Sequence, residues 1–205
     1  MLVLHYTGMP SAEAALARLT DAAAQVSAHY LIEENGSVTR LVPESKRAWH
    51  AGVSCWRGAS GVNARSIGVE LVNPGHEFGY RPFPDAQMAA LETLASDIVP
   101  RLAIPARNVV GHADVAPPRK MDPGELFDWR RLAAAGVGLW PEGIDCAPVP
   151  EDAVASLLAA YGYDPGDLRS ALVAFQRHFA RHRLDGVADA ATRRTLAALA
   201  GTIGN

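Results

Sequence analysis

Short apolar runs separated by turn residues dominate the first 110 residues and indicate β-strands. Between the second and third runs, Asn35-Gly36 provides the strongest short-range signal for a tight hairpin. The expected strands cover residues 2–5, 29–33, 38–42, 67–72 and 109–111.

Apolar residues at helical spacing follow Ser11, a good N-cap, and recur from Asp85 to Leu102 and from Leu126 to Ala135. The first helix is expected to bury a face that includes Leu16. Residues 49–65 are rich in Gly, Ser and Trp without a clear period, which predicts a long loop. This order of strands and helices predicts an α/β fold with a central mixed β-sheet flanked by helices.

A change of composition divides the chain. Three prolines between residues 141 and 150 indicate a linker, and three helical patterns follow it at 152–161, 167–182 and 190–199. We therefore expect a main domain over 1–143, a linker over 144–150 and a small C-terminal three-helix domain over 151–205.

The composition is that of a globular protein. Of 205 residues, 49% are hydrophobic and 20% charged, and the net charge is −3. This balance argues against general nucleic-acid binding, which needs a basic surface, and no apolar run is long enough for a membrane span. We expect a monomer.

Three residues in distinctive settings suggest a metal site. His5 and His112 each follow an apolar run, and Asp122 lies in a proline-stiffened loop. Two imidazoles and one carboxylate form a ligand set that Zn²⁺ uses when one position stays open for water. A zinc site formed by these residues would suit hydrolysis of an amide.

Glu70 and Lys120 are the candidate catalytic residues beside this site. Glu70 is the one charged residue in the apolar run 67–72, where burial would raise its pKa and suit it to act as a general base. The alternative is that it reaches solvent or pairs with Arg65. Lys120 would stabilise an oxyanion if a turn brings it to the same side as Asp122; otherwise it is a solvated charge.

The motifs together resemble the zinc N-acetylmuramoyl-L-alanine amidases of the amidase type 2 family, whose fold is shared with the peptidoglycan-recognition proteins. The resemblance implies that His5, His112 and Asp122 are the zinc ligands and that Glu70 and Lys120 are catalytic. It also suggests His50, Trp49, His29 and Asn35 for substrate binding, with a structural role as the alternative for His29. The motifs that carry it are His5-Tyr6-Thr7, residues 27–32, Asn35-Gly36, residues 49–52, 67–70, 111–117 and 120–124.

The resemblance implies hydrolysis of the bond between N-acetylmuramic acid and L-alanine in peptidoglycan or muropeptides. The alternatives are a non-catalytic recognition protein and a phage-type lysin. Because the chain starts directly with a predicted strand, we expect a cytoplasmic location; the alternative is the periplasm, with an upstream signal.

The C-terminal part resembles the three-helix peptidoglycan-binding domain at residues 172–179, 184–189 and 192–196. The alternative is a helical bundle that only packs on the main domain. His178 and His182, four residues apart on one predicted helix, could share a cation, but Arg177, Arg181 and Arg183 disfavour one. His76 belongs to no motif and is expected to be exposed.

Overall fold

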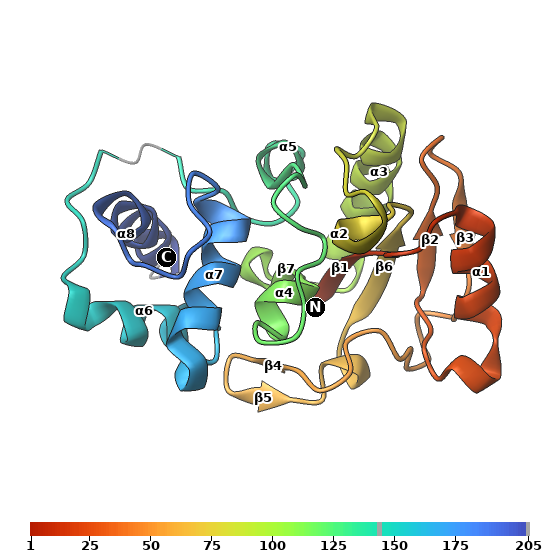
Figure 1. The fold of residues 1–205 in the computed structure, drawn as a ribbon, viewed down its shortest axis with the longest axis horizontal. Helices are drawn as coiled ribbons and strands as arrows, with labels where there is room; N and C mark the ends of the chain where they lie inside the picture. Colours follow the sequence, from red (N-terminus) through yellow and green to blue (C-terminus); the bar gives the residue numbers. More distant parts are fainter. Residues whose placement is uncertain (143–144, 204–205) are drawn as a thin grey trace.

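A computed structural model describes residues 1–142 and 145–203, with a five-stranded sheet at the centre (Figure 1). The strand order is β3-β2-β6-β1-β7, with β3 antiparallel to β2 and the other neighbours parallel, so the predicted mixed sheet is confirmed. The hairpin at Asn35-Gly36 joins β2 to β3. The strands are β1 (Leu2–Tyr6), β2 (Tyr30–Ile32), β3 (Val38–Arg40), β6 (Ile67–Leu71) and β7 (Val109–Gly111).

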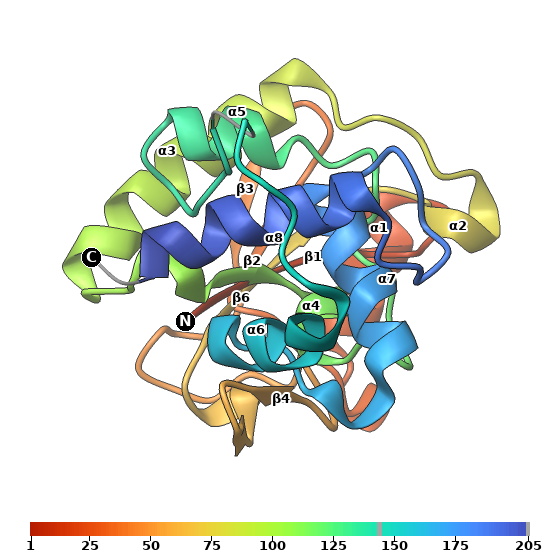
Figure 2. The same cartoon turned by 90° about the vertical axis from the view of Figure 1, so that its left-hand side faces the viewer.

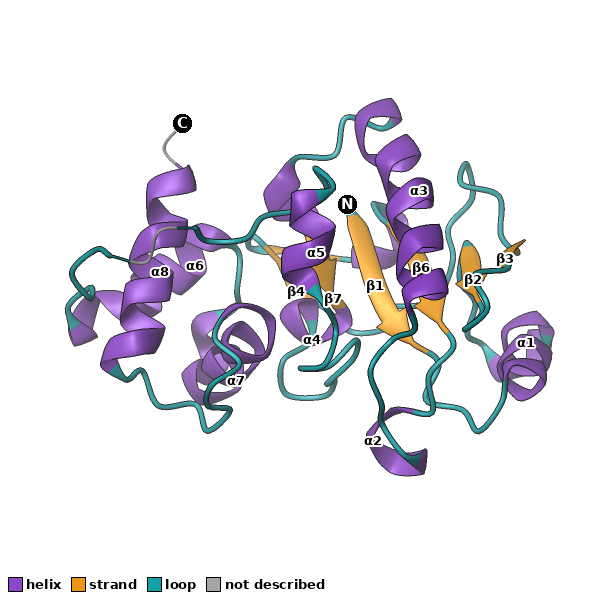
Figure 3. Ribbon diagram, turned by 90° about the horizontal axis from the view of Figure 1, so that it is seen from above, coloured by secondary structure: helices purple, strands orange, loops and turns teal. Residues whose placement is uncertain are grey.

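Helices flank this sheet, as the sequence predicts, and α3 and α5 lie over the same face of it (Figure 3). The α-helices are α1 (Ala12–Thr20), α2 (Gly75–Phe78), α3 (Asp85–Arg101), α4 (His112–Val115), α5 (Trp129–Ala134), α6 (Val154–Tyr161), α7 (Leu168–Phe179) and α8 (Ala190–Ile203). Single 3₁₀ turns cover Ala22–Ala24, Val62–Ala64, Ala106–Asn108, Glu151–Ala153 and Pro165–Asp167.

Three local expectations need correction. The predicted loop over residues 49–65 contains a small hairpin of β4 (Cys55–Trp56) and β5 (Ala59–Ser60), held down by the fully buried Trp56. Leu16, expected on a buried helix face, is exposed because α1 packs with little more than Ala15. The helix predicted from Leu126 starts at Trp129, because the carboxylate of Asp128 caps it by accepting from the amide of Arg131.

Alternation along the strands sorts the side chains onto two faces of the sheet. Leu2 and Leu4 of β1 pack with α3 and α5 in one core cluster. Val3 belongs to a second cluster on the opposite face. His5 follows Val3 by two residues and therefore points to this second face, away from α3 and α5.

The C-terminal helices share the second cluster with the sheet. Val3, Val110 and Ala113 pack in the same cluster as Tyr163 and Phe175, so this core continues from the sheet into α6, α7 and α8 (Figure 2). The predicted boundary between main domain and linker, at 143 and 144, lies outside the described residues. No described helix combines the length and the apolar character that crossing a membrane requires.

Candidate metal centre

Neighbouring strands place His5 and Glu70 side by side. β1 and β6 run parallel, and the register pairs His5 with Glu70. Because paired residues on neighbouring strands point to the same face, both side chains leave the sheet on the face opposite α3 and α5. They lie near the carboxyl ends of parallel strands, where α/β folds most often form ligand sites.

A turn brings the other two ligand candidates to the same place. β7 ends at Gly111, and His112 is the first residue of α4. After α4 the backbone amides of Arg119 and Lys120 both donate to the carbonyl of Ala116, which folds the chain back. The amide of Ala113 then donates to the carbonyl of Asp122 at 2.8 Å, which fixes Asp122 beside α4.

The three predicted ligands converge on one point. His5 Nδ1, His112 Nδ1 and Asp122 Oδ2 lie 3.0 Å from one another in all three pairs. All three residues are buried. Two imidazole nitrogens and a carboxylate oxygen facing a common centre fit the donor set of a zinc site with an open position.

Hydrogen bonds on the far side of each imidazole orient it toward this centre. His112 Nε2 donates to the carbonyl of Ala51 at 3.1 Å. This leaves the lone pair of His112 Nδ1 facing Asp122, as metal ligation by a neutral imidazole requires.

A longer chain of hydrogen bonds does the same for His5. Because the carbonyl of Val62 can only accept, the hydroxyl of Ser66 donates to it, at 2.6 Å. Ser66 then accepts from His50 Nε2 at 3.3 Å, and His50 Nδ1 accepts from His5 Nε2 at 3.0 Å. The lone pair of His5 Nδ1 is therefore left for a metal.

Burial favours the neutral imidazole at His5 and at His50. Desolvation, together with the neighbouring His112, lowers the pKa of His5 to about 4, and desolvation holds the pKa of His50 well below its usual value. Burial acts to raise the pKa of Asp122, but contact with His112 and His5 outweighs it, so this pKa is lowered. Near neutral pH His5 is therefore a neutral imidazole and Asp122 a carboxylate, the protonation states in which these two groups bind a metal.

The pKa of Glu70 is shifted in the opposite direction from that of Asp122. Burial, and secondarily the charge of Asp122, raise the pKa of Glu70 well above its usual value, and Lys120 opposes this only in part. Its Oε2 atom is buried and has no hydrogen-bond partner among the described residues. The alternative pairing with Arg65 is not formed, because that guanidinium donates to the carbonyls of Trp56 and Ala59.

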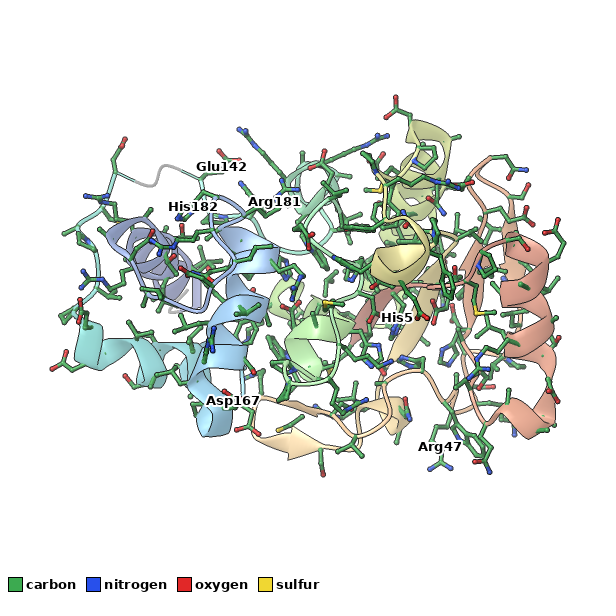
Figure 4. The ribbon with its side chains drawn as sticks, in the orientation of Figure 1. His5, Arg47, Glu142, Asp167, Arg181 and His182 are labelled. Carbon is green, nitrogen blue, oxygen red and sulfur yellow. The ribbon has the colours of Figure 1, made fainter. Side chains whose placement is uncertain are left out.

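A pocket of about 360 Å³ opens above the cluster. Its lining includes the three ligand candidates and also Glu70 and Lys120, so the turn at Ala116 brings Lys120 and Asp122 to the same cavity. Arg18 and Arg119 also line this pocket and add positive charge to it. Figure 4 shows His5 in the interior and Arg47 at the surface of the same half of the molecule.

The four residues expected to bind substrate lie in different settings. Trp49 is 45% exposed at the pocket mouth, with the guanidinium of Arg47 5.9 Å from its ring centroid. His50 reaches the pocket wall but is mainly buried behind His5. His29 and Asn35 are outside the residues that line this pocket.

Local hydrogen bonds account for both residues outside the pocket. His29 is fully buried; its Nδ1 accepts from the amide of Gly68 and its Nε2 donates to the carbonyl of Lys46. The exposed Asn35 accepts from the amide of Ser37 and so closes the hairpin turn. Their contribution to substrate binding stays a prediction.

Sequence reasoning gave no role to several residues around the centre. Ser66 is hydrogen-bonded to His50, behind His5, and Asp114 accepts from the amide of Gly111, the residue before His112. His76, expected to be exposed, is half-buried: it is hydrogen-bonded to Tyr6 at 2.9 Å and to Glu125 at 3.2 Å. The bond between Asp114 and Gly111 spans only three residues, whereas the bond of Ser66 to His50 and those of His76 span at least 16 positions, which no local pattern could have identified.

Comparison with known proteins agrees with this geometry. A family model described as N-acetylmuramoyl-L-alanine amidase matches residues 1–125. The amidase AmiD of Escherichia coli K12 is 43% identical, over 97% of this chain and 81% of that protein. The 1,6-anhydro-N-acetylmuramyl-L-alanine amidase AmpD of Haemophilus influenzae is 43% identical over 54% of this chain and 59% of that protein.

Solved structures extend the likeness to the C-terminal helices. AmiD from E. coli, solved with the substrate anhydro-N-acetylmuramic acid-L-Ala-D-γ-Glu-L-Lys, superposes with a TM-score of 0.89 and covers 100% of this chain and 89% of that one. AmpDh3 from Pseudomonas aeruginosa gives 0.88 at 34% identity, over 100% of this chain and 92% of that one. The chain therefore belongs to the N-acetylmuramoyl-L-alanine amidase family.

Proposed function

We propose that this protein is a zinc-dependent amidase that hydrolyses the bond between the lactyl group of N-acetylmuramic acid and L-alanine. The observation that carries the proposal is the convergence of His5, His112 and Asp122 in one pocket with the unpartnered carboxylate oxygen of Glu70. Membership of the amidase family supports the same reaction.

The metal would be held by His5 Nδ1, His112 Nδ1 and Asp122 Oδ2. A bound zinc ion would supply a Lewis acid that lowers the pKa of a water and polarises a carbonyl. The protein keeps both imidazoles oriented through their outer nitrogens, so little reorganisation accompanies binding.

Glu70 would move the proton. Its carboxylate takes a proton from the attacking water as the oxygen bonds to the amide carbon. It then passes that proton to the nitrogen of L-alanine as the carbon–nitrogen bond breaks. The raised pKa suits both steps, because a carboxylate poised closer to neutral pH accepts and returns a proton readily.

Lys120 would stabilise the negative charge that develops on the amide oxygen. It shares the pocket with Glu70, and its position after the turn at Ala116 directs it to the same cavity as Asp122. A fixed positive charge in a partly dehydrated pocket favours the charged tetrahedral state over the neutral amide.

We propose muropeptides with an anhydro-sugar end as the substrate class. The AmiD structure contains such a molecule, and AmpDh3 has been solved with an anhydromuramic pentapeptide. Stem peptides carry carboxylates, and the positive charges of Arg18, Arg119 and Lys120 in the pocket lining complement them. The exposed ring of Trp49 offers an apolar surface at the mouth of the pocket.

Mass spectrometry of an anhydro-muropeptide incubated with the protein tests the proposal. We expect a free peptide that begins with L-alanine, whose release stops with a chelator and returns with Zn²⁺. Glu70→Gln should reduce turnover by roughly 10²–10⁴-fold while zinc affinity changes little, because it removes proton transfer and no ligand. An intact substrate with the zinc-loaded wild-type protein would contradict the proposed reaction.

A further inference from the structure

Two of the candidate ligands, His112 and Asp122, lie outside the strands of the sheet. His5 lies within the interior strand β1 and is paired there with Glu70 of β6, while the pairing of β1 with β7 on the other side ends one residue earlier, at Leu4. In contrast, β7 is an edge strand of three residues. His112 and Asp122 follow it, in the four-residue α4 and in the loop beyond.

The C-terminal helices occupy the space beyond this edge, and the first contact is with α4. Asp114, two residues after His112, is buried, and its Oδ2 accepts from the amide of Gly111 at 2.7 Å. The same oxygen accepts from His178 Nδ1 at 2.7 Å, and Oδ1 accepts from the hydroxyl of Tyr163 at 2.7 Å. Two partners of this carboxylate therefore come from the C-terminal part.

The second contact is with the loop that follows Asp122. Arg181 Nη1 donates to the carbonyls of Glu125 at 3.1 Å and Phe127 at 3.0 Å. Arg177 Nε donates to the carboxylate of Glu125 at 3.2 Å and is only 12% exposed. Figure 4 shows Arg181 at the end of α7 that faces the main domain.

Stacking fixes the imidazole that makes the first contact. The ring of His178 is stacked between two aromatic rings. Its centroid lies 3.7 Å from that of Trp129 in α5 and 3.8 Å from that of Phe179. His182 points elsewhere, toward Asp189 at 3.2 Å. The two histidines thus have separate partners, and His178 serves the contact between the two parts of the chain.

We propose that the carboxyl end of α7, together with the turn that follows it as far as Arg181, is a positioning element of the metal centre. His178 holds α4, which carries His112, and Arg177 and Arg181 hold the loop that carries Asp122. The backbone bond from Ala113 to Asp122 joins these two segments, so the contacts act on one unit. This inference rests on the proposed zinc site and assigns a role to the C-terminal helices besides any binding of peptidoglycan.

The expected effect falls on metal affinity. The three side chains are outside the residues that line the pocket over the cluster, so none is expected to touch substrate. Loss of groups that orient metal ligands typically weakens metal binding 10–100-fold. We expect a loss in this range for Arg181→Ala and for His178→Phe, which keeps the stacked ring but removes the donor.

The test compares zinc dissociation constants by chelator competition in the full chain. Arg169→Ala is the matched control, because Arg169 is exposed on the same helix and its hydrogen bond stays within the C-terminal part. Leu199→Ala controls for general loss of stability, because it opens a cavity in the buried part of α8. Arg181→Lys, which retains a donor, should recover most of the affinity.

Unchanged affinity in both Arg181→Ala and His178→Phe would overturn the inference, as would an equal loss in Leu199→Ala. Wild-type protein that binds no zinc would instead refute the proposed function. Because coupling is reciprocal, zinc should also slow hydrogen exchange in residues 175–183 of the wild-type chain more than in the distant hairpin 30–40. Equal responses in the two segments would contradict the inference even if a variant failed to fold.

Discussion

Gly68 tests the chain of hydrogen bonds that orients His5. It lies in β6 against the ring of His50. A Cβ atom at this position would lie 2.4 Å from Cγ, 2.5 Å from Cδ2 and 2.7 Å from Nδ1 of His50. The backbone of Gly68 has no positive φ, so the effect of Gly68→Ala comes from this overlap alone.

The size of the overlap fixes the expected consequence. Carbon atoms in contact lie about 3.5–4.0 Å apart, so the ring must move by roughly 1 Å. Such a shift breaks the contacts of His50 with His5 at 3.0 Å and with Ser66 at 3.3 Å. We expect zinc affinity to fall 10–100-fold, about 1.4–2.7 kcal/mol, and the metal-free protein to lose about 1–3 kcal/mol through overpacking.

Chelator competition measures the first effect, and urea denaturation of the metal-free protein measures the second. Gly201→Ala is the control, because Gly201 lies in α8 with nothing within 4 Å of an added Cβ. Zinc affinity equal to wild type in Gly68→Ala protein would refute the reasoning. His5 would then hold its orientation without His50.

Two further predictions concern charge. Lys120→Met should lower turnover by roughly 10–10³-fold with zinc affinity little changed, because it removes stabilisation of the oxyanion; unchanged kcat in steady-state assays would exclude that role. The second prediction concerns metal-free Glu70→Gln protein, because the raised pKa of the Glu70 carboxyl would otherwise increase stability as the pH falls and mask the effect of His5. The free energy of unfolding of this variant should decrease as the pH falls from about 6.5 toward 4. The pKa of His5 is lowered to about 4 in the folded state, so in this pH range His5 takes up a proton when the protein unfolds. This uptake lowers the free energy of unfolding by about 3 kcal/mol. A flat stability profile by urea denaturation between pH 7.5 and 4.5 would contradict this.

The sheet and the candidate ligands His5, His112 and Asp122 could be predicted because local sequence patterns indicate them. The apolar runs, the Asn35-Gly36 turn and the helical period of α3 depend on neighbours in sequence, so the sequence records them directly. His5 and His112 were recognisable for the same reason, because each follows a short apolar run. Glu70 stood out as a charge within such a run, and burial in the fold raises its pKa, as the sequence led us to expect.

What could not be predicted depends on tertiary contacts. His178 bonds to Asp114 across 64 residues, and Tyr6 to His76 across 70. The β4–β5 hairpin has strands of two residues, too short for a period to show, and it is anchored by the burial of Trp56. The exposure of Leu16 follows from the position of α1 on the fold, which its own apolar spacing does not encode.

The two histidines differ in how their orientation is secured, and this difference decides where the centre is vulnerable. His112 donates to a backbone carbonyl, that of Ala51, which no single substitution removes. His5 depends on the side chains of His50 and Ser66 and on the space left by Gly68. Conversely, pairing with β6 fixes the backbone of His5, whereas the backbone of His112 relies on Asp114 and the C-terminal helices. His5 therefore has a fixed backbone but a ring orientation that depends on other side chains, and for His112 the reverse holds. Substitutions at Gly68 or His50 should weaken metal binding through His5, whereas substitutions at Asp114 or His178 should weaken it through His112.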